Sequence, residues 1–140
     1  MWKDASSLVE AILEQIADSV IFADATGTIM RWNDAAAALF GYSAAEALGQ
    51  KLDLIIPDHL RAAHWRGFEA AMTGGVMRLQ GRPTVTRATH RTGRKLYVEM
   101  TFALVKGPAG RAACGAVAVA RDETERIERQ RADARRDSPE

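Results

Sequence analysis

The apolar positions at the start of the chain follow first a helical and then a strand period. Over residues 8–16 they lie on one side of a helix, which a capping box of Ser7 and Glu10 opens. Two β-rich runs follow, 20–24 and 28–32, and the three residues between them have the composition of a tight turn. The pattern therefore predicts a short helix followed by a β-hairpin.

Helices are expected next. Asn33 or Asp34 caps a first short helix, and Ser43 forms a capping box with Glu46 at the start of a second. Pro57 then opens a longer helix, which ends at a threonine followed by two glycines. All of these helices are therefore predicted to follow one another in a single stretch of the chain, between the hairpin and the remaining strands.

Three further strands are expected at residues 84–91, 95–105 and 111–121. In the middle one, apolar and polar residues alternate, which is typical of a strand with one buried and one wetter face. A charged helix capped by Asp122 ends the chain, with too few apolar residues to be stable alone. This order predicts an α+β fold, in which helices cover one face of a five-stranded antiparallel sheet.

Composition narrows the class of protein. A chain of 140 residues suits one domain with a genuine core. Cys114 is the only cysteine, which excludes an internal disulfide and a cysteine zinc cluster and suits a reducing, cytoplasmic compartment. The first residues are too charged for an export signal, and no apolar run is long enough to cross a bilayer, so we expect no membrane association.

Charge is unevenly distributed along the chain. Residues 61–95 carry eight lysines and arginines and a single acid, Glu69. This stretch either attracts anions or is simply a solvated face, and the second interpretation is favoured. Aromatic residues do not interleave with the basic ones and no DNA-reading motif is present, so nucleic acid is not an expected partner. Motifs typical of enzymes, such as a nucleophile elbow or a phosphate-binding loop, do not occur either.

Several motifs resemble those of the PAS family. They begin with "ADATGTIMRWNDAAAALFGYSAAEALGQKL" and continue with an "HRTG" turn and a closing "RDETERIER", in which Asp122 and Thr124 match the family's Asp-x-Thr junction. The residues at the family's spacing are Asp24, Gly27, Asn33, Phe40, Gly41, Tyr42, Glu46 and Gly49. The resemblance implies a PAS fold with one long helix among several short ones, and a regulator, not an enzyme.

The resemblance also divides the chain into three parts. Residues 1–18 are expected to form a flanking helix that makes a homodimer, residues 19–121 the sensor domain, and residues 122–140 a signalling helix or linker. The homodimer is expected because Leu8 and Ile12 belong to an apolar stripe outside the sheet. A downstream signalling domain or protein is the implied receiver of the signal.

His64 interrupts the apolar stripe of the long helix, four residues after Leu60 and four before Phe68. The segment 59–93 resembles haem-binding PAS oxygen sensors, in which this helix supplies a histidine as the proximal iron ligand. A neutral imidazole is a usual ligand of haem iron. The resemblance thus implies that His64 is the metal ligand of a haem b, and that the protein senses a diatomic gas such as O2, CO or NO.

The rest of the expected pocket follows from strand alternation and from the resemblance. Ala116 and Ala118 are small on one face of the last strand and leave room for a flat ligand. Arg82 is expected on the strand face of Thr84, where the oxygen sensors often have an arginine, to donate to bound oxygen or pair with a propionate. The expected cofactor-binding residues are His64, Met77, Leu79, Arg82, Thr84, Met100, Phe102, Ala116 and Ala118, with Met77 or Met100 as an alternative sulfur ligand.

The alternative is a PAS domain whose pocket is empty or holds another ligand. His64 is then a buried imidazole bonded to backbone, no cofactor is present, and the protein is a dimerisation module. His59 and His90 are expected to be exposed, and Trp65 to be a packing or dimer residue. A flavin-binding PAS domain fits least well, because Cys114 lies in the last strand and not on a helix.

Overall fold

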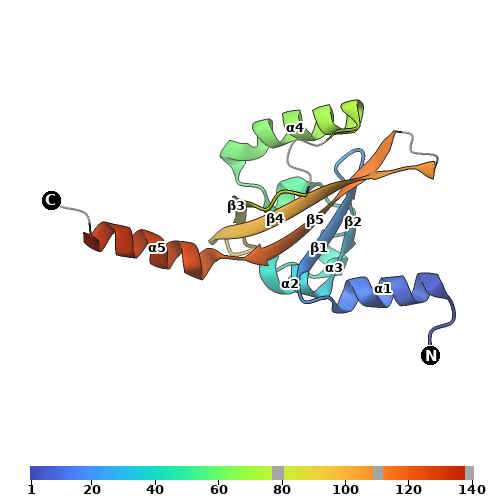
Figure 1. Cartoon of the computed structure of the whole chain (residues 1–140), viewed down its shortest axis with the longest axis horizontal. Helices are drawn as coiled ribbons and strands as arrows, with labels where there is room; N and C mark the ends of the chain where they lie inside the picture. The colour runs from blue at the N-terminus through green and yellow to red at the C-terminus, as the bar shows by residue number, and fades with distance from the viewer. Residues whose placement is uncertain (77–80, 109–111, 138–140) are drawn as a thin grey trace.

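A five-stranded antiparallel sheet forms the centre of the molecule, with strand order β2-β1-β5-β4-β3 (Figure 1). The computed structural model describes residues 1–76, 81–108 and 112–137. The strands are β1 Ser19–Asp24, β2 Ile29–Trp32, β3 Thr84–Thr89, β4 Lys95–Lys106 and β5 Ala113–Asp122. The predicted α+β class and the five antiparallel strands are confirmed.

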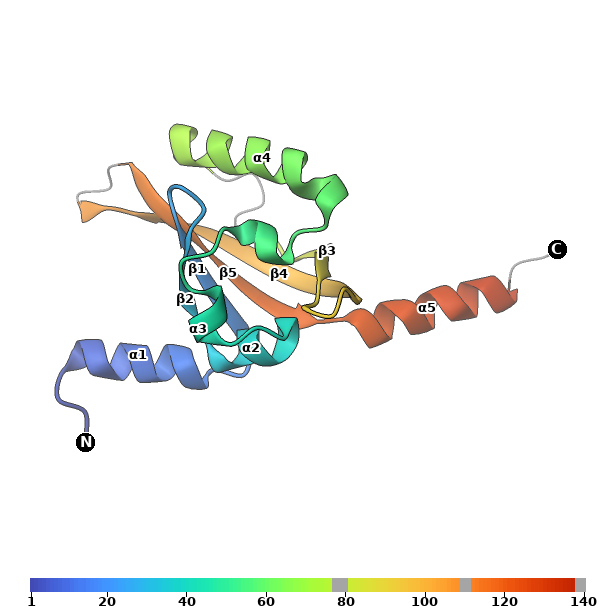
Figure 2. The same ribbon diagram turned by 180° about the vertical axis from the view of Figure 1, so that it is seen from behind.

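Helices connect and flank these strands. The α-helices are α1 Ala5–Gln15, α2 Asp34–Phe40, α3 Ala44–Ala47, α4 Arg61–Gly74 and α5 Thr124–Asp137, and two 3-10 helices are η1 Leu52–Ile55 and η2 Asp58–Leu60. Seen from behind, α2, α3 and η1 lie in front of the strands, and α4 lies above β4 and β5 (Figure 2). The helices between β2 and β3 therefore gather on one side of the sheet, as the sequence predicts.

The core lies between this helical layer and the sheet. It is made by apolar residues of the inner sheet face together with α2, α3 and η1, because alternate strand residues point to one face. The members that are fully inaccessible are Ile29, Ala36, Phe40, Ala47, Leu96 and Val98. In contrast, α1 contributes no buried residue, and it extends away from the sheet on the side opposite to α5 (Figure 1).

Two predicted helix starts are corrected by the structure. The first helix is capped by Asp4, not by a Ser7–Glu10 box, because the Asp4 carboxylate accepts from the Ser7 N–H at 2.8 Å and the helix begins one turn earlier. The long helix does not start at Pro57, since the 3-10 turn η2 comes first and α4 begins only at Arg61. The predicted caps at Asn33 and at Ser43 with Glu46 are confirmed.

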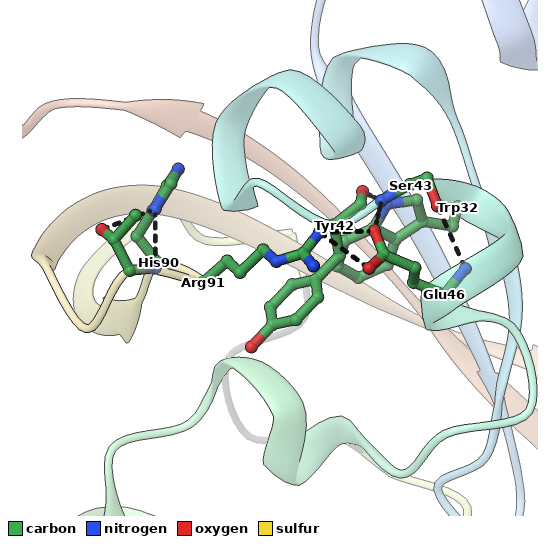
Figure 3. A network of polar contacts seen from close by, with 7 residues as sticks. Trp32, Tyr42, Ser43, Glu46, His90 and Arg91 are labelled. Atoms are coloured by element: carbon green, nitrogen blue, oxygen red, sulfur yellow. Dashed lines mark hydrogen bonds and ion pairs between the residues drawn. The ribbon is translucent and has the colours of Figure 1, made fainter.

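Several residues of the PAS motifs form one polar network (Figure 3). Glu46 accepts from the Ser43 N–H at 2.9 Å and pairs with the Arg91 guanidinium at 2.7 Å, and that guanidinium lies over the Tyr42 ring. Trp32 donates its indole N–H to the Tyr42 carbonyl at 2.9 Å. The network joins the β3–β4 turn to α2 and α3, so these motif residues hold the helical layer on the sheet.

His90 is half-buried, contrary to the prediction that it is exposed. Its ring packs so closely on Gly41 that a Cβ there would lie 2.6 Å from His90 Cε1. His90 Nδ1 also lies 3.0 Å from the Thr92 hydroxyl. Turn residues are usually solvated, but here the β3–β4 turn folds back onto the end of α2. His59, in contrast, is exposed as expected.

The α5 helix is attached to the sheet through Tyr97. The Glu123 N–H donates to the Tyr97 carbonyl at 2.8 Å, and the Tyr97 N–H donates to the Thr124 hydroxyl at 2.9 Å. The Arg131 guanidinium lies over the Tyr97 ring, 4.9 Å from its centre. Asp122 accepts from the Thr124 N–H at 2.9 Å, so it stabilises the first turn of α5 without the predicted box to Glu125.

Replacing Asp122 by alanine is expected to weaken the start of α5 by about 1 kcal/mol, because the Thr124 N–H loses its acceptor. Amide hydrogen exchange should show faster exchange in α5 and unchanged protection in the sheet. Glu128→Ala, at an exposed position of the same helix, is the control and should leave exchange in the first turn unchanged. Equal protection of α5 in wild type and Asp122→Ala would contradict the role of Asp122.

Candidate functional site

Five of the residues expected to line a pocket lie on one face of the sheet. Thr84 is opposite Met100, and Phe102 is opposite Ala118, in antiparallel pairs whose side chains share a face. Ala116 is opposite both Leu104 of β4 and Ala23 of β1, so it lies on this same face. The alternation read from the sequence is therefore confirmed, and this face is the one that also carries the core.

Burial falls along this inner face from one end of β4 to the other. Leu96 and Val98 are fully inaccessible and Met100 is 7% exposed, but Phe102 is only half-buried. The described pocket positions beyond the core, Thr84, Ala116 and Ala118, are half-buried as well. The short helices close one end of the sheet tightly, whereas the end near α4 is less completely covered.

His64 lies on α4, in an aromatic group with Trp65 and Phe68. Its ring centre is 4.8 Å from that of Trp65, edge to face, and 5.9 Å from that of Phe68. Its Nδ1 atom is buried and has no hydrogen-bond partner among the residues that the structure describes. A buried nitrogen without a partner costs free energy. The hydrogen bond to backbone that was expected for a His64 without a metal is not found at this atom in the described part of the chain.

Burial lowers the pKa of the His64 imidazole, and the negative charge of the Asp53 carboxylate opposes this shift. The neutral form of the ring is therefore favoured in the folded protein. Neutral imidazole is the form that binds iron or another transition metal. The electrostatics of the site thus suit a ligating histidine.

The structure corrects the expected place of Arg82. β3 begins at Thr84, so Arg82 does not share a strand face with it; Arg82 is exposed and lies between Gly81, which has a positive φ of 73°, and Pro83. Proline has no N–H to give to a strand ladder, which ends regular pairing here. The Gly81 N–H still donates to the Phe102 carbonyl at 3.2 Å, so the segment stays beside β4. Met77 and Leu79 lie outside the described residues.

Asp53 has a part in the site that sequence reasoning missed. Its carboxylate accepts from the Trp65 indole N–H at 2.7 Å, and its carbonyl accepts from the Arg61 guanidinium at 3.1 Å. Trp65 is a packing residue, one of the two roles expected for it. The sequence did show an indole beside the apolar stripe of the long helix, which signals a need for a hydrogen-bond acceptor. The acceptor, Asp53, is twelve residues away on another element, and no local pattern identifies it.

A haem requires an axial ligand and a space in the protein. The described residues provide a candidate ligand, whereas two hollows on the described surface lie elsewhere. A half-buried histidine on α4 is the residue type that holds haem iron, and the small Ala116 and Ala118, opposite Leu104 and Phe102, are the residue types that would lie against a flat macrocycle. Of the two hollows, one lies along α1 and one on the outer sheet face around Glu99 and Arg121. Within the described ranges no three His, Cys, Asp or Glu side chains cluster to hold a metal ion without a macrocycle.

No helix in the described part of the chain combines the length and the apolar character needed to span a bilayer.

Comparison with known proteins identifies relatives among bacterial sensors. The family model described as "PAS fold" matches residues 7–122. The chain is 30% identical over 107 residues to the oxygen sensor protein DosP of Escherichia coli, a match that covers 74% of this chain and 13% of DosP. It is 38% identical over 56 residues to the sensor protein FixL of Bradyrhizobium diazoefficiens, covering 40% of this chain and 11% of FixL. The chain thus spans only a small part of the length of these relatives.

Solved structures share the fold. The PAS domain of a Colwellia psychrerythraea protein superimposes with a TM-score of 0.73 at 20% identity, covering 87% of this chain and 99% of that one. An RNA-binding Light-Oxygen-Voltage receptor superimposes with a TM-score of 0.70 at 24% identity, covering 90% of this chain and 35% of that one. At these identities the likeness establishes the arrangement of the elements and no ligand.

Proposed function

This chain belongs to the PAS family, and from that premise we propose that it is a sensory module that binds haem b through His64 and senses a diatomic gas. The observation that carries the proposal is the half-buried His64 imidazole, whose neutral form is favoured by burial and whose ring nitrogens have no hydrogen-bond partner in the described structure, so that Nε2 is free to bind iron. The relatives DosP, called an oxygen sensor, and FixL, called a sensor, support the same class of function.

The other residues of the proposed site have separable tasks. When bound, haem would supply an iron centre that takes one small gas molecule. Met100 and Phe102 present apolar surface from β4, which would keep water away from a bound gas. Ala116 and Ala118 are the small inner-face residues that would leave room for a planar ring, and Thr84 lies opposite Met100. The exposed Arg82 would serve as a partner for a propionate at the edge of the site. Met77 and Leu79 remain proposed lining residues.

A haemin titration tests the proposal. Purified protein given one equivalent of haemin is expected to develop a sharp Soret band, distinct from that of free haemin, and reduction followed by CO should shift it again. A PAS domain without a histidine on the long helix, at the same concentration, is the control for non-specific binding. Folded protein that leaves the haemin spectrum unchanged would contradict haem binding.

A ligand-free PAS interaction module is the second candidate. The observation that favours it is the exposed apolar side of α1, where Leu8, Ile12 and Ile16 line a hollow suited to a second protein surface. In this case the half-buried inner residues are a loosely packed core, and the exposed apolar side of α1 is the functional surface. The same titration separates the two candidates.

We also propose a cytoplasmic homodimer that passes its signal to a further domain or protein. A free, exposed Cys114 suits a reducing compartment. A homodimer is supported by the exposed Leu8, Ile12 and Ile16, which share one side of α1. The contacts of α5 with Tyr97 connect β4 to the end of the chain, which gives a change in the sheet a physical route to α5.

A further inference from the structure

We propose that Trp65 is a positioning residue for His64, and that it acts because its indole rests on the backbone of Gly27 in the β1–β2 turn. The inference deepens the proposed function, on which it rests where it names His64 as an iron ligand. It concerns three residues from separate elements: Gly27 of the turn, Asp53 of η1 and Trp65 of α4, here called the indole clamp.

The indole clamp holds Trp65 on two sides. Its Nε1 donates to the Asp53 carboxylate at 2.7 Å, which fixes one edge of the ring. The far edge of the ring lies on Gly27, because a Cβ built there would be 2.2 Å from Trp65 Cη2 and 2.3 Å from Cζ3. Gly27 is buried and has a positive φ of 81°, so only glycine both adopts this backbone and leaves room for the ring.

The part of the clamp that lies in the β1–β2 turn is firmly held. The Gly27 N–H donates to the Asp24 carbonyl at 2.9 Å, and the Gly27 carbonyl accepts from the Leu52 N–H at 3.1 Å. The Asp24 carboxylate accepts from the Thr26 and Thr28 N–H groups. The turn therefore resists movement, and a clash at Gly27 is expected to displace the indole and not the turn.

A displacement of the indole also moves His64, because both residues belong to α4. The two residues are adjacent on one helix, about 100° apart around its axis, so a rotation that moves one ring moves the other by the same angle. Their rings are already in edge-to-face contact, with centres 4.8 Å apart, and Trp65 also packs on Phe68 at 5.5 Å. The clamp thus sets the rotation of α4, and with it where the His64 imidazole lies relative to the inner sheet face.

A pair of glycines provides a matched test. Gly49 has a φ of 86°, close to that of Gly27, but a Cβ there would meet nothing within 4 Å. Alanine at either position has the same backbone strain from the positive φ, whereas only the Cβ of Gly27→Ala clashes with the Trp65 ring. Trp65→Phe shortens the ring, so in that background Gly27→Ala should behave like Gly49→Ala.

Two readouts follow the three single variants and the double variant Gly27→Ala/Trp65→Phe. In protein without haem, NMR of the Trp65 indole N–H and the His64 ring protons should shift in Gly27→Ala and stay in place in Gly49→Ala. Haemin affinity should fall by roughly tenfold or more in Gly27→Ala and hardly change in Gly49→Ala, as for loss of a residue that orients a metal ligand. In the Trp65→Phe background, Gly27→Ala should cost no further affinity.

The outcomes that overturn the inference are equally defined. It is wrong if Gly27→Ala leaves the His64 resonances and haemin affinity as they are in Gly49→Ala. It is also wrong if Gly27→Ala unfolds and Trp65→Phe does not restore folding, since the effect is then one of backbone alone. If wild-type protein binds no haemin, the proposed function fails, but the NMR comparison still decides whether the clamp positions His64.

Discussion

Substitution of His64 by alanine is expected to abolish the Soret band while the fold survives. Haem iron would lose its proposed protein ligand, and the macrocycle alone retains only apolar contacts with the inner sheet face. Affinity for haemin should fall by about a hundredfold or more, the largest effect expected from a single residue here. The measurement is a haemin titration followed at the Soret maximum, with circular dichroism of the same sample to confirm folding.

The fold is expected to survive for a structural reason. His64 Nδ1 has no hydrogen bond within the described structure, so its removal leaves no partner unsatisfied. The His64 side chain as a whole is only half-buried, so the cavity left behind is small. His59→Ala is the control, because His59 is an exposed histidine on η2 just before the same helix. A Soret band that persists in His64→Ala, or disappears equally in His59→Ala, would refute ligation by His64.

Substitution of Ile12 by glutamate is expected to convert the proposed homodimer to a monomer. Ile12 is 49% exposed and lines the apolar hollow of α1 together with Leu8 and Ile16. Burying an isoleucine stabilises by about 1.5–3 kcal/mol, and a twofold interface contains it twice. The dissociation constant of the dimer should therefore rise by roughly a hundredfold or more, as measured by sedimentation velocity over a range of concentrations.

A point variant is a cleaner test than removal of the whole helix. The Leu13 carbonyl accepts from the Asn33 side chain at 2.8 Å, and Asn33 also caps α2, so a chain without residues 1–17 loses more than its dimer surface. Val9→Glu is the control, because Val9 is 53% exposed but does not line that hollow. A dimer that tolerates Ile12→Glu as well as Val9→Glu would show that α1 is not the interface.

Local patterns in the sequence determined most of the fold. The strand alternation placed Met100 with Phe102, and Ala116 with Ala118, on one face of their own strands correctly, because a strand has a two-residue period. The register between β4 and β5 then decided that both pairs lie on the same sheet face. The caps at Asn33 and Ser43 were also predictable from local sequence, since a cap and its N–H donors lie within one turn. The PAS resemblance was carried by such local motifs, and it supplied the position of His64.

Two predictions failed because of neighbouring residues in the chain, and a third failed because two distant segments meet. Asp4 took the cap of α1 from Ser7 because its carboxylate reaches the Ser7 N–H, a competition between neighbours that residue type alone does not decide. Arg82 left the strand face because Pro83 ends the ladder beside it. His90 became half-buried because the β3–β4 turn packs on Gly41, at the end of α2 and about fifty residues away in sequence.

For the candidate site, too, some features were determined by the sequence and others only by the tertiary structure. The sequence by itself determined that an imidazole would lie on the apolar side of the long helix, since a helical period fixes which residues share a face. Only the tertiary structure decided that His64 Nδ1 would be buried without a partner, and that Trp65 would rest on Gly27 and bond Asp53. These features depend on how α4 docks, and docking is set by contacts between segments far apart in sequence, which no local period encodes.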